Sequence, residues 1–407
     1  MTRTQSFQHY ATTAGQISVV LTCLFIPLST SLMGLFSLLT MLFWLISGGI
    51  LKLPTLVAKS PTVLVCITLF IYMAISIGYT SAPVSLAVDT LLKYRELLFI
   101  PAIITLLSNN QRYSRMAENS FLTGSIILMV ISYGIYFSII PPQKYGYSIM
   151  YHITHSFFMA ALGFWAFQRL LENSKYRYFW FIVLLGVIVN IFHVNTGRTG
   201  MLIFLLLILF SVIQRLSFKK IVAAVVIAVA LLSAAFIYSD NLSSRTQLAL
   251  SEIQNYQPGK SRSSLGMRFD WWQNSVELIQ EAPIFGHGAG SFTQLQKRLI
   301  ANKKTMPTDN PHNEYLFISV QFGYVGLVMF LSLLLALIAV ANSLTKNNRH
   351  LLQGVVVAMA AGCFINSFLY DTHQGHFFAF LSAVLVSKAP SLQLGTSTER
   401  QIANSTG

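Results

Sequence analysis

The chain alternates between long apolar runs and short polar connections. Most runs approach the roughly 20 residues that a helix needs to cross a bilayer, and their apolar residues do not alternate with polar ones as in barrel strands. The pattern therefore predicts an all-α integral membrane protein with about twelve transmembrane helices. The expected spans are 16–31, 33–51, 61–79, 95–108, 120–140, 153–171, 179–194, 200–216, 220–238, 313–342, 351–369 and 376–388.

One connection is much longer than the others and divides the chain. We expect transmembrane helices 1–9 in residues 1–238, a long loop in 239–311, helices 10–12 in 312–389 and a polar tail in 390–407. Within the loop, residues 242–256 and 268–281 show helical spacing, and residues 286–291 form a glycine-rich turn. The tenth span should bend near Gly323 and Gly326.

Composition supports the membrane assignment. Hydrophobic residues make up 54% of the chain and charged residues only 10%, against about 25% charged in soluble domains. Cys23, Cys66 and Cys363 lie in apolar runs, which is typical of small core residues and predicts no disulfide framework. No cleavable signal peptide is expected, because the first apolar run lacks a small-residue cleavage site.

The net charge is +14, and the basic residues that produce it are distributed according to the side of the membrane on which each connection is expected. Lys and Arg concentrate at the N-terminus, at every second connection and in the tail, as cytoplasmic segments do. Both termini are therefore expected in the cytoplasm and the long loop outside it. No nucleic-acid-binding motif accompanies the charge, so the expected surroundings are membrane lipid. The basic residues assigned to the inner side are Arg3, Lys52, Lys59, Arg112, Arg115, Arg169, Lys175, Arg177, Arg215, Lys219, Lys220, Lys346, Arg349, Lys388 and Arg400.

Two arginines on the outer side are candidates for binding an anion. Arg198 stands between glycines at the start of a span, where backbone N–H groups and a guanidinium can both face phosphate oxygens; the alternative is an interfacial arginine that reaches toward water. Arg268 precedes an aromatic pair in the long loop, and its alternative is a local pair with Asp270 or a solvated face.

Further charged residues lie near span ends on the same side. Lys93 and Arg95 run against the inside preference for positive charge, so they are candidates for a substrate path; a surface pair between Arg95 and Glu96 is the alternative. Asp371 stands in a short outer connection with two histidines. These have the spacing of a metal pair, but no third ligand is evident, so we favour polar shaping of a cavity mouth and expect no metal site. The histidines are His373 and His376, and His152, His155 and His287 are interpreted in the same way.

His312 occupies the boundary between a polar and an apolar segment. Pro311 suits a first helical turn and Asp309 and Asn310 are good capping residues, so His312 is predicted in the first turn of the tenth span. The alternative is an interfacial histidine with no chemistry. Cations in a partly dehydrated cavity would bind a diphosphate, and a neutral histidine could deprotonate a hydroxyl. Glycosyl transfer from a lipid diphosphate requires both.

These motifs resemble a known family. His312-Asn313, nine residues, then Gly323-x-x-Gly326 is similar to the signature of the O-antigen ligase and polymerase superfamily, and Arg198 and Arg268 resemble its two outer-loop arginines. The resemblance implies a metal-independent, inverting glycosyltransferase of the GT-C type, without a cofactor, in the bacterial inner membrane. It would move a glycan from undecaprenyl diphosphate at the periplasmic face.

The resemblance also implies roles for individual residues. His312 would be the general base, and Arg198 and Arg268 would hold the diphosphate. Further candidates for substrate contacts are Asn313, Lys93, Arg95 and Asp371.

The superfamily leaves more than one acceptor open. It contains lipopolysaccharide ligases, glycan polymerases and protein O-oligosaccharyltransferases. We favour the ligase, which attaches O-antigen to lipid A–core, because the chain has no large soluble domain to grip a protein acceptor. A flippase for lipid-linked sugars would need cations through the depth of the bundle, and the candidates here cluster on one side.

Overall fold

The computed structural model describes residues 3–172, 175–195, 197–215, 247–248, 250–259, 262–303 and 305–392. Eleven helices in these ranges coincide with eleven of the predicted spans. They are α1 (Arg3–Phe25), α2 (Thr30–Ile46), α4 (Pro61–Ile75), α6 (Glu96–Leu107), α7 (Gln111–Tyr136), α8 (His152–Leu171), α9 (Arg177–Val189), α10 (Arg198–Arg215), α15 (Glu314–Ala341), α16 (Lys346–Ile365) and α17 (Thr372–Val386). The predicted ninth span at 220–238, residues 242–246 and 249 of the predicted helix at 242–256 and the tail beyond 392 lie outside the described residues.

Six helices are long and apolar enough to cross a membrane, and a bent pair makes a seventh candidate. The protein is therefore an all-helical, multi-pass membrane protein, and the total of twelve spans stays a prediction. The candidates are Pro61–Gly78, Gln111–Tyr136, Arg177–Val194, Arg198–Arg215, Glu314–Ala341 and Lys346–Ile365, with Thr30–Ile46 plus Gly49–Lys59 as the bent pair.

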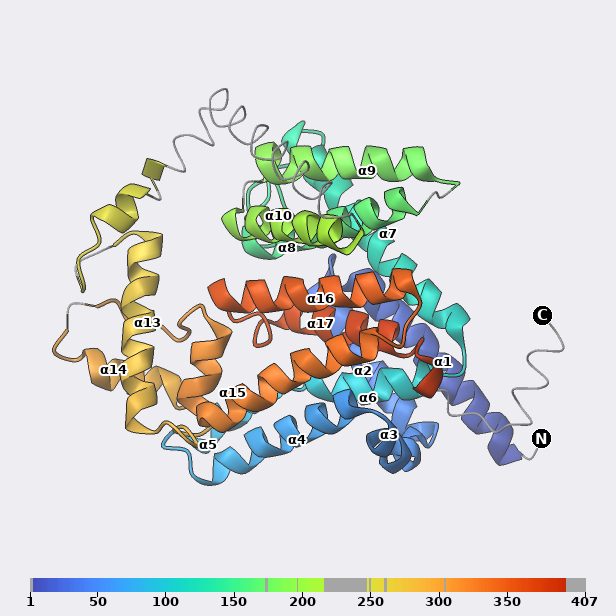
Figure 1. The fold of residues 1–407 in the computed structure, drawn as a ribbon, viewed down its shortest axis with the longest axis horizontal. Helices are drawn as coiled ribbons and strands as arrows, with labels where there is room; N and C mark the ends of the chain where they lie inside the picture. The colour runs from blue at the N-terminus through green and yellow to red at the C-terminus, as the bar shows by residue number, and fades with distance from the viewer. Residues whose placement is uncertain are drawn as a thin grey trace.

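Two short helices form the centre of the bundle. α6 and α17 pack against each other, and nearly every residue of both is buried. Figure 1 shows them among α2, α15 and α16. Because neighbouring helices cover them on all sides, their continuous apolar sequence reflects a protein core as much as a lipid environment.

The second predicted span is wrong at its C-terminal end. Residues 33–51 were expected to be one helix, but α2 ends at Ile46. Gly48 then takes a left-handed conformation at φ 75°, which stops the helix. The chain bends by 72° into a 3₁₀ turn and the short helix α3 (Leu53–Lys59). The helices α5 (Val84–Lys93) and α14 (Phe292–Ile300) are not among the sequence predictions either.

The predicted bend in the tenth span is confirmed at Gly323. This residue has φ 62° and ψ −168°, which interrupts α15. The glycine-rich turn packs into the interruption, where the N–H of Gly288 donates to the carbonyl of Gln321 at 2.8 Å and that of Tyr324 to Pro283 at 2.8 Å. A Cβ atom on Gly323 would lie 2.2 Å from the carbonyl oxygen of Ile284, so only glycine fits there.

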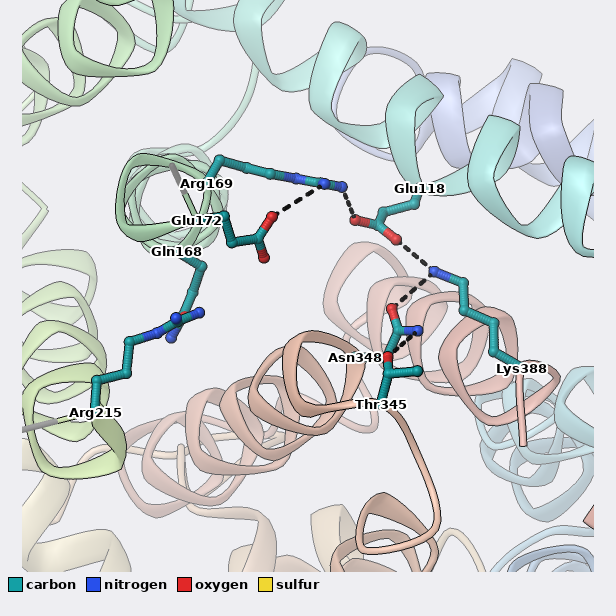
Figure 2. A network of polar contacts seen from close by, with 8 residues as sticks. All are labelled: Glu118, Gln168, Arg169, Glu172, Arg215, Thr345, Asn348 and Lys388. Atoms are coloured by element: carbon teal, nitrogen blue, oxygen red, sulfur yellow. Dashed lines mark hydrogen bonds and ion pairs between the residues drawn. The ribbon is translucent and has the colours of Figure 1, made fainter. Parts of the chain in front are cut away.

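A polar network joins five helices at one end of the bundle (Figure 2). The buried carboxylate of Glu118 in α7 accepts hydrogen bonds from Arg169 of α8 and from Lys388, which follows α17, both at 2.6 Å. Lys388 also donates to Asn348 of α16 at 3.3 Å, and Arg215 of α10 donates to a glutamine of α8. Three cations assigned to the inner side therefore meet at the same end.

The candidate site lies at the other end of these helices. α13 (Ser264–Glu281) crosses that end, far from the start of α1 (Figure 1). On α8, 17 residues separate the network at Arg169 from His152, or about 26 Å at 1.5 Å per residue. This length approaches the hydrocarbon thickness of about 30 Å. The inner-side and outer-side residues of α8 and α10 are thus at opposite ends, as the charge pattern predicts.

Candidate functional site

His312 lies just outside helix α15, so its predicted place in the first helical turn is wrong. The helix begins at Glu314, and Asn313 caps it by accepting a hydrogen bond from the N–H of Leu316 at 3.0 Å. His312 has a left-handed φ of 53°. The side chain of Asn310 accepts from the N–H of His312 at 2.7 Å, and this local turn competes with helix formation.

Two tryptophans of α13 hold the His312 segment in place. The indole N–H of Trp272 donates to the carbonyl of Pro311 at 2.9 Å, and that of Trp271 donates to Met306 at 2.8 Å. The ring of Trp271 lies against the imidazole, with centroids 5.4 Å apart. The two adjacent tryptophans therefore fix the backbone around His312.

Asn313 is engaged within the protein at both ends of its amide. Its oxygen caps α15, and its nitrogen donates to the carbonyl of Phe364 at 2.9 Å. The residue is buried. Its position indicates that it orients the neighbouring His312 by joining the start of α15 to the end of α16.

Arg198 and Arg268 line one cavity of about 670 Å³. Arg198 is the first residue of α10 and Arg268 belongs to the second turn of α13, so the long loop brings them together. Burial lowers the pKa of Arg268 from its ordinary value, and the nearby charge of Arg198 lowers it further. Both remain cations at neutral pH, and their mutual repulsion makes the cavity favourable for an anion.

The rest of the cavity wall combines polar and apolar side chains. The polar and aromatic members are Tyr145, Tyr147, His152, Asn195, Thr199 and Ser264. The apolar members are Ile153, Val194, Leu202, Leu265 and Ile365.

The structure does not contain the alternative pair between Arg268 and Asp270. The carboxylate of Asp270 accepts hydrogen bonds from the hydroxyl of Tyr256 at 2.7 Å and the N–H of Gly259 at 2.9 Å. The acidic neighbour of the arginine pair is instead Glu252, 3.9 Å from Arg198. One carboxylate against two guanidinium groups leaves a net positive charge.

His312 reaches the wall of this cavity through Asn366. The Nδ1 atom of His312 lies 3.3 Å from the amide oxygen of Asn366, and the amide nitrogen donates to Thr199 at 3.4 Å. Thr199 lines the cavity beside Arg198. Burial and the charge of Arg268 lower the pKa of His312 more than the contact with Asn366 raises it. The imidazole is therefore neutral at pH 7, as a base must be.

Three of the predicted site residues lie outside this cavity, namely Lys93, Arg95 and Asp371. The ammonium of Lys93 lies 5.9 Å above the ring of Tyr370, and burial raises the pKa of Asp371 to about 6 while Lys93 acts in the opposite direction. Arg95 donates to the carbonyl of Leu92 at 2.6 Å and lies 3.9 Å from Glu96; the alternative expected this pair at the surface, but Glu96 is buried. None of the three lines the cavity of Arg198 and Arg268.

The histidines near Asp371 bind neighbouring helices. His373 contacts the carbonyl of Ile26 at 2.8 Å and the hydroxyl of Thr30 at 2.9 Å. His376 lies 3.3 Å from the hydroxyl of Ser37 in α2 and 3.2 Å from the carboxyl of Glu96 in α6. Within the described ranges, no group of three histidine, cysteine, aspartate or glutamate side chains is arranged to hold a metal ion.

Two residues that organise the site were missing from the sequence predictions. Asn366 stands at the end of a predicted apolar span, where the polar pair Asn366-Ser367 interrupts the apolar sequence. Glu314, buried in the first turn of α15, accepts from the hydroxyl of Tyr94 and from the N–H groups of Leu369 and Tyr370, all within 3.1 Å. It ties the His312 segment to the connection before α17.

Fold and site together define a multi-pass membrane protein with two arginines and a histidine gathered at one end of its helical bundle. Residues 191–331 match the family described as O-antigen ligase, a segment that contains Arg198, Arg268, His312 and the break at Gly323. Over this segment the chain is similar to the O-antigen ligase family, whose members are membrane glycosyltransferase-like ligases and polymerases.

A curated relative is similar over part of the chain. An uncharacterized protein of Haemophilus influenzae is 32% identical over 143 residues, which are 33% of this chain and 35% of the relative. The match thus spans about a third of that protein, and it assigns no activity.

Proposed function

We propose that this protein attaches O-antigen polysaccharide to lipid A–core at the periplasmic face of the bacterial inner membrane, with undecaprenyl diphosphate as the leaving group. The proposal depends on one observation. Arg198 and Arg268 line the same cavity, and His312 is coupled to the wall of that cavity through Asn366 and Thr199. The similarity of residues 191–331 to the O-antigen ligase family supports a lipid-linked polysaccharide as the substrate class.

The reaction follows from the placement of charge and base. His312 accepts the proton of an acceptor hydroxyl, and the hydroxyl oxygen forms a bond to the anomeric carbon. The bond from that carbon to the phosphate oxygen breaks, and the electron pair leaves with undecaprenyl diphosphate. Arg198 and Arg268 stabilise the negative charge that develops on the diphosphate. Attack opposite the leaving group inverts the anomeric centre.

Each part of the site has a defined role in this scheme. The apolar side chains of Leu202 and Ile365 line the same cavity as the arginines and would face the first isoprene units. Asn313 and Asn366 orient the base. Lys93 and Asp371 lie outside the cavity, so we assign them to the acceptor, whose sugars offer hydroxyls to a carboxylate and an ammonium.

Purified protein with a lipid-linked donor and lipid A–core tests the proposal. We expect His312→Ala to abolish transfer, because His312 is the proposed base for the acceptor hydroxyl. We expect Arg198→Ala and Arg268→Ala to weaken donor binding. His9→Ala is the matched control, since His9 is an exposed histidine in the first half of α1 and does not line the cavity. Normal transfer by the His312 variant would exclude its role as base. Activity that persists in EDTA is expected, and strict dependence on an added divalent ion would contradict the mechanism.

A strain that lacks the gene distinguishes the ligase from a polymerase. Loss of the ligase should leave all lipid A–core uncapped while lipid-linked polymer accumulates. Loss of a polymerase should leave cores capped with single repeats, and that result would replace the proposed acceptor.

A further inference from the structure

Two tyrosines line the cavity of Arg198 and Arg268 and have no role in the mechanism described above. Tyr145 and Tyr147 flank Gly146 at the tip of a turn in the connection between α7 and α8, and all three residues line the cavity. The turn closes through a hydrogen bond from the N–H of Gly146 to the carbonyl of Gln143 at 3.1 Å, and Gly146 takes φ 71°. Both tyrosines are exposed, with 39% and 46% of their surface accessible.

The turn is fixed to the bundle by a buried polar chain. The hydroxyl of Ser148 contacts His155 at 2.9 Å, the other imidazole nitrogen contacts Asn190 at 2.8 Å, and Asn190 donates to Ser132 at 3.0 Å. All four residues are fully buried. Asn190 also begins a π-helical turn, Asn190–Val194, whose last residue lines the cavity. The tyrosines therefore project from a preorganised base, which lowers the entropic cost of binding a ligand.

Each of the two tyrosine rings packs against a neighbouring aromatic ring. Tyr147 packs edge-to-face with Tyr136 at 5.3 Å, and Tyr145 packs in the same way with Tyr151 at 6.2 Å. The ammonium of Lys144 lies 5.5 Å from the ring of Tyr145. The rings thus offer an apolar surface with a hydroxyl at one edge, beside a cation. A sugar ring has the matching chemistry, with an apolar C–H face and hydroxyls at its rim.

We propose that Tyr145 and Tyr147 form a carbohydrate subsite for the sugar attached to the diphosphate of the donor, an inference that rests on the proposed function. The first sugar is covalently joined to the diphosphate. A diphosphate held by Arg198 and Arg268 therefore leaves that sugar inside the same cavity. Among the described residues, the two tyrosines are the phenol side chains that share this cavity with the arginines.

Full-length protein in detergent, with two matched ligands, tests the subsite. One ligand is undecaprenyl diphosphate without sugar, and the other is a lipid-linked glycan that the wild-type protein transfers. Tyr147→Ala should weaken binding of the glycan-bearing lipid about tenfold and raise its KM correspondingly, with carrier-lipid affinity unchanged within about twofold. Tyr147→Phe should keep most of the affinity because the ring face remains. Tyr178→Ala, an 83% exposed tyrosine on α9, is the control.

Three outcomes would overturn the subsite. Equal weakening of both ligands would mean that the tyrosines only support the pocket. An unchanged KM for the glycan-bearing donor would mean that they do not touch sugar. A rise confined to the KM of the acceptor would assign the turn to the acceptor. If wild-type protein transfers no glycan, the proposed function itself fails, and that result is distinct from all three.

Discussion

The amide oxygen of Asn366 faces the Nδ1 atom of His312 at 3.3 Å. A carbonyl oxygen can only accept a hydrogen bond, so Nδ1 carries the proton and Nε2 keeps the lone pair. On the other side of the amide, the nitrogen of Asn366 donates to the hydroxyl of Thr199 at 3.4 Å. Asn366 thus selects the tautomer in which Nε2 is the base.

Asn366 should therefore act through His312 without touching the reacting atoms. We expect Asn366→Leu to lower kcat about 100-fold, as misplacement of a catalytic group does, with the KM of the donor nearly unchanged. Asn366→Asp keeps an acceptor opposite Nδ1 and should recover much of the rate. A negative neighbour favours the imidazolium, so the pKa of His312 should rise and the acid limb of the pH profile should move to higher pH. Equal losses in both variants would show that Asn366 serves only packing.

Arg268 should set the pH dependence of transfer. Burial of the imidazole, and then the charge of Arg268, lower the pKa of His312 below the ordinary value of 6.5. The base works when neutral, so activity should rise with pH through that lowered pKa and level off near pH 7. Arg268→Gln removes a positive neighbour, so the pKa of His312 rises and the acid limb moves to higher pH. Arg268→Lys should leave the limb in place.

The pH profile of the residual activity measures this shift. Burial raises the pKa of Asp371 to about 6, so this carboxyl titrates in the same range and Asp371→Asn is the necessary control. The acid limb should persist in the Asp371 variant. Its disappearance would assign the limb to Asp371 and contradict the role of His312.

Gly323 should tolerate no side chain. A Cβ atom would lie 2.2 Å from the carbonyl oxygen of Ile284, and φ 62° with ψ −168° is a conformation that other residues avoid. We expect Gly323→Ala to lower the free energy of unfolding by about 3 kcal/mol. Thermal unfolding in detergent measures the loss. Gly34→Ala, in helix α2 with no atom within 4 Å of the new methyl group, should have little effect.

Glu118 should be the centre of the network at the opposite end of the bundle. Lys388→Met leaves this buried carboxylate with Arg169 alone, and the free energy of unfolding should fall by about 3 kcal/mol, as for other broken buried pairs. The double variant Lys388→Met with Glu118→Gln also removes the charge of the buried carboxylate, so it should be less destabilised than Lys388→Met alone. Lys303→Met breaks an exposed pair with Glu277 and should cost below about 1 kcal/mol.

Absence of coupling between the changes at Lys388 and Glu118 would contradict this view of the network. Transfer activity should also be kept in the folded fraction of each variant, because the network lies about 26 Å from the cavity along α8.

The hydropathy pattern determined the helical class of this protein and the approximate position of eleven helices. Apolar runs with few charges fold as helices in a bilayer because the backbone must satisfy its own hydrogen bonds there. The pattern erred where conformation is a property of single residues, as at Gly48, which ends α2 early, and at Asn310, whose side chain binds the N–H of His312 and delays α15.

The motifs named His312, Arg198 and Arg268, and they placed the break at Gly323, because these residue types carry their chemistry or their backbone freedom with them. Only the tertiary structure brought the three polar residues together, by laying α13 across the end of the bundle. Only it separated Lys93, Arg95 and Asp371 from that cavity and revealed Asn366 and the tyrosine turn. The physical reason is that residues more than 100 positions apart meet through helix packing, which depends on the shapes of all the side chains between them.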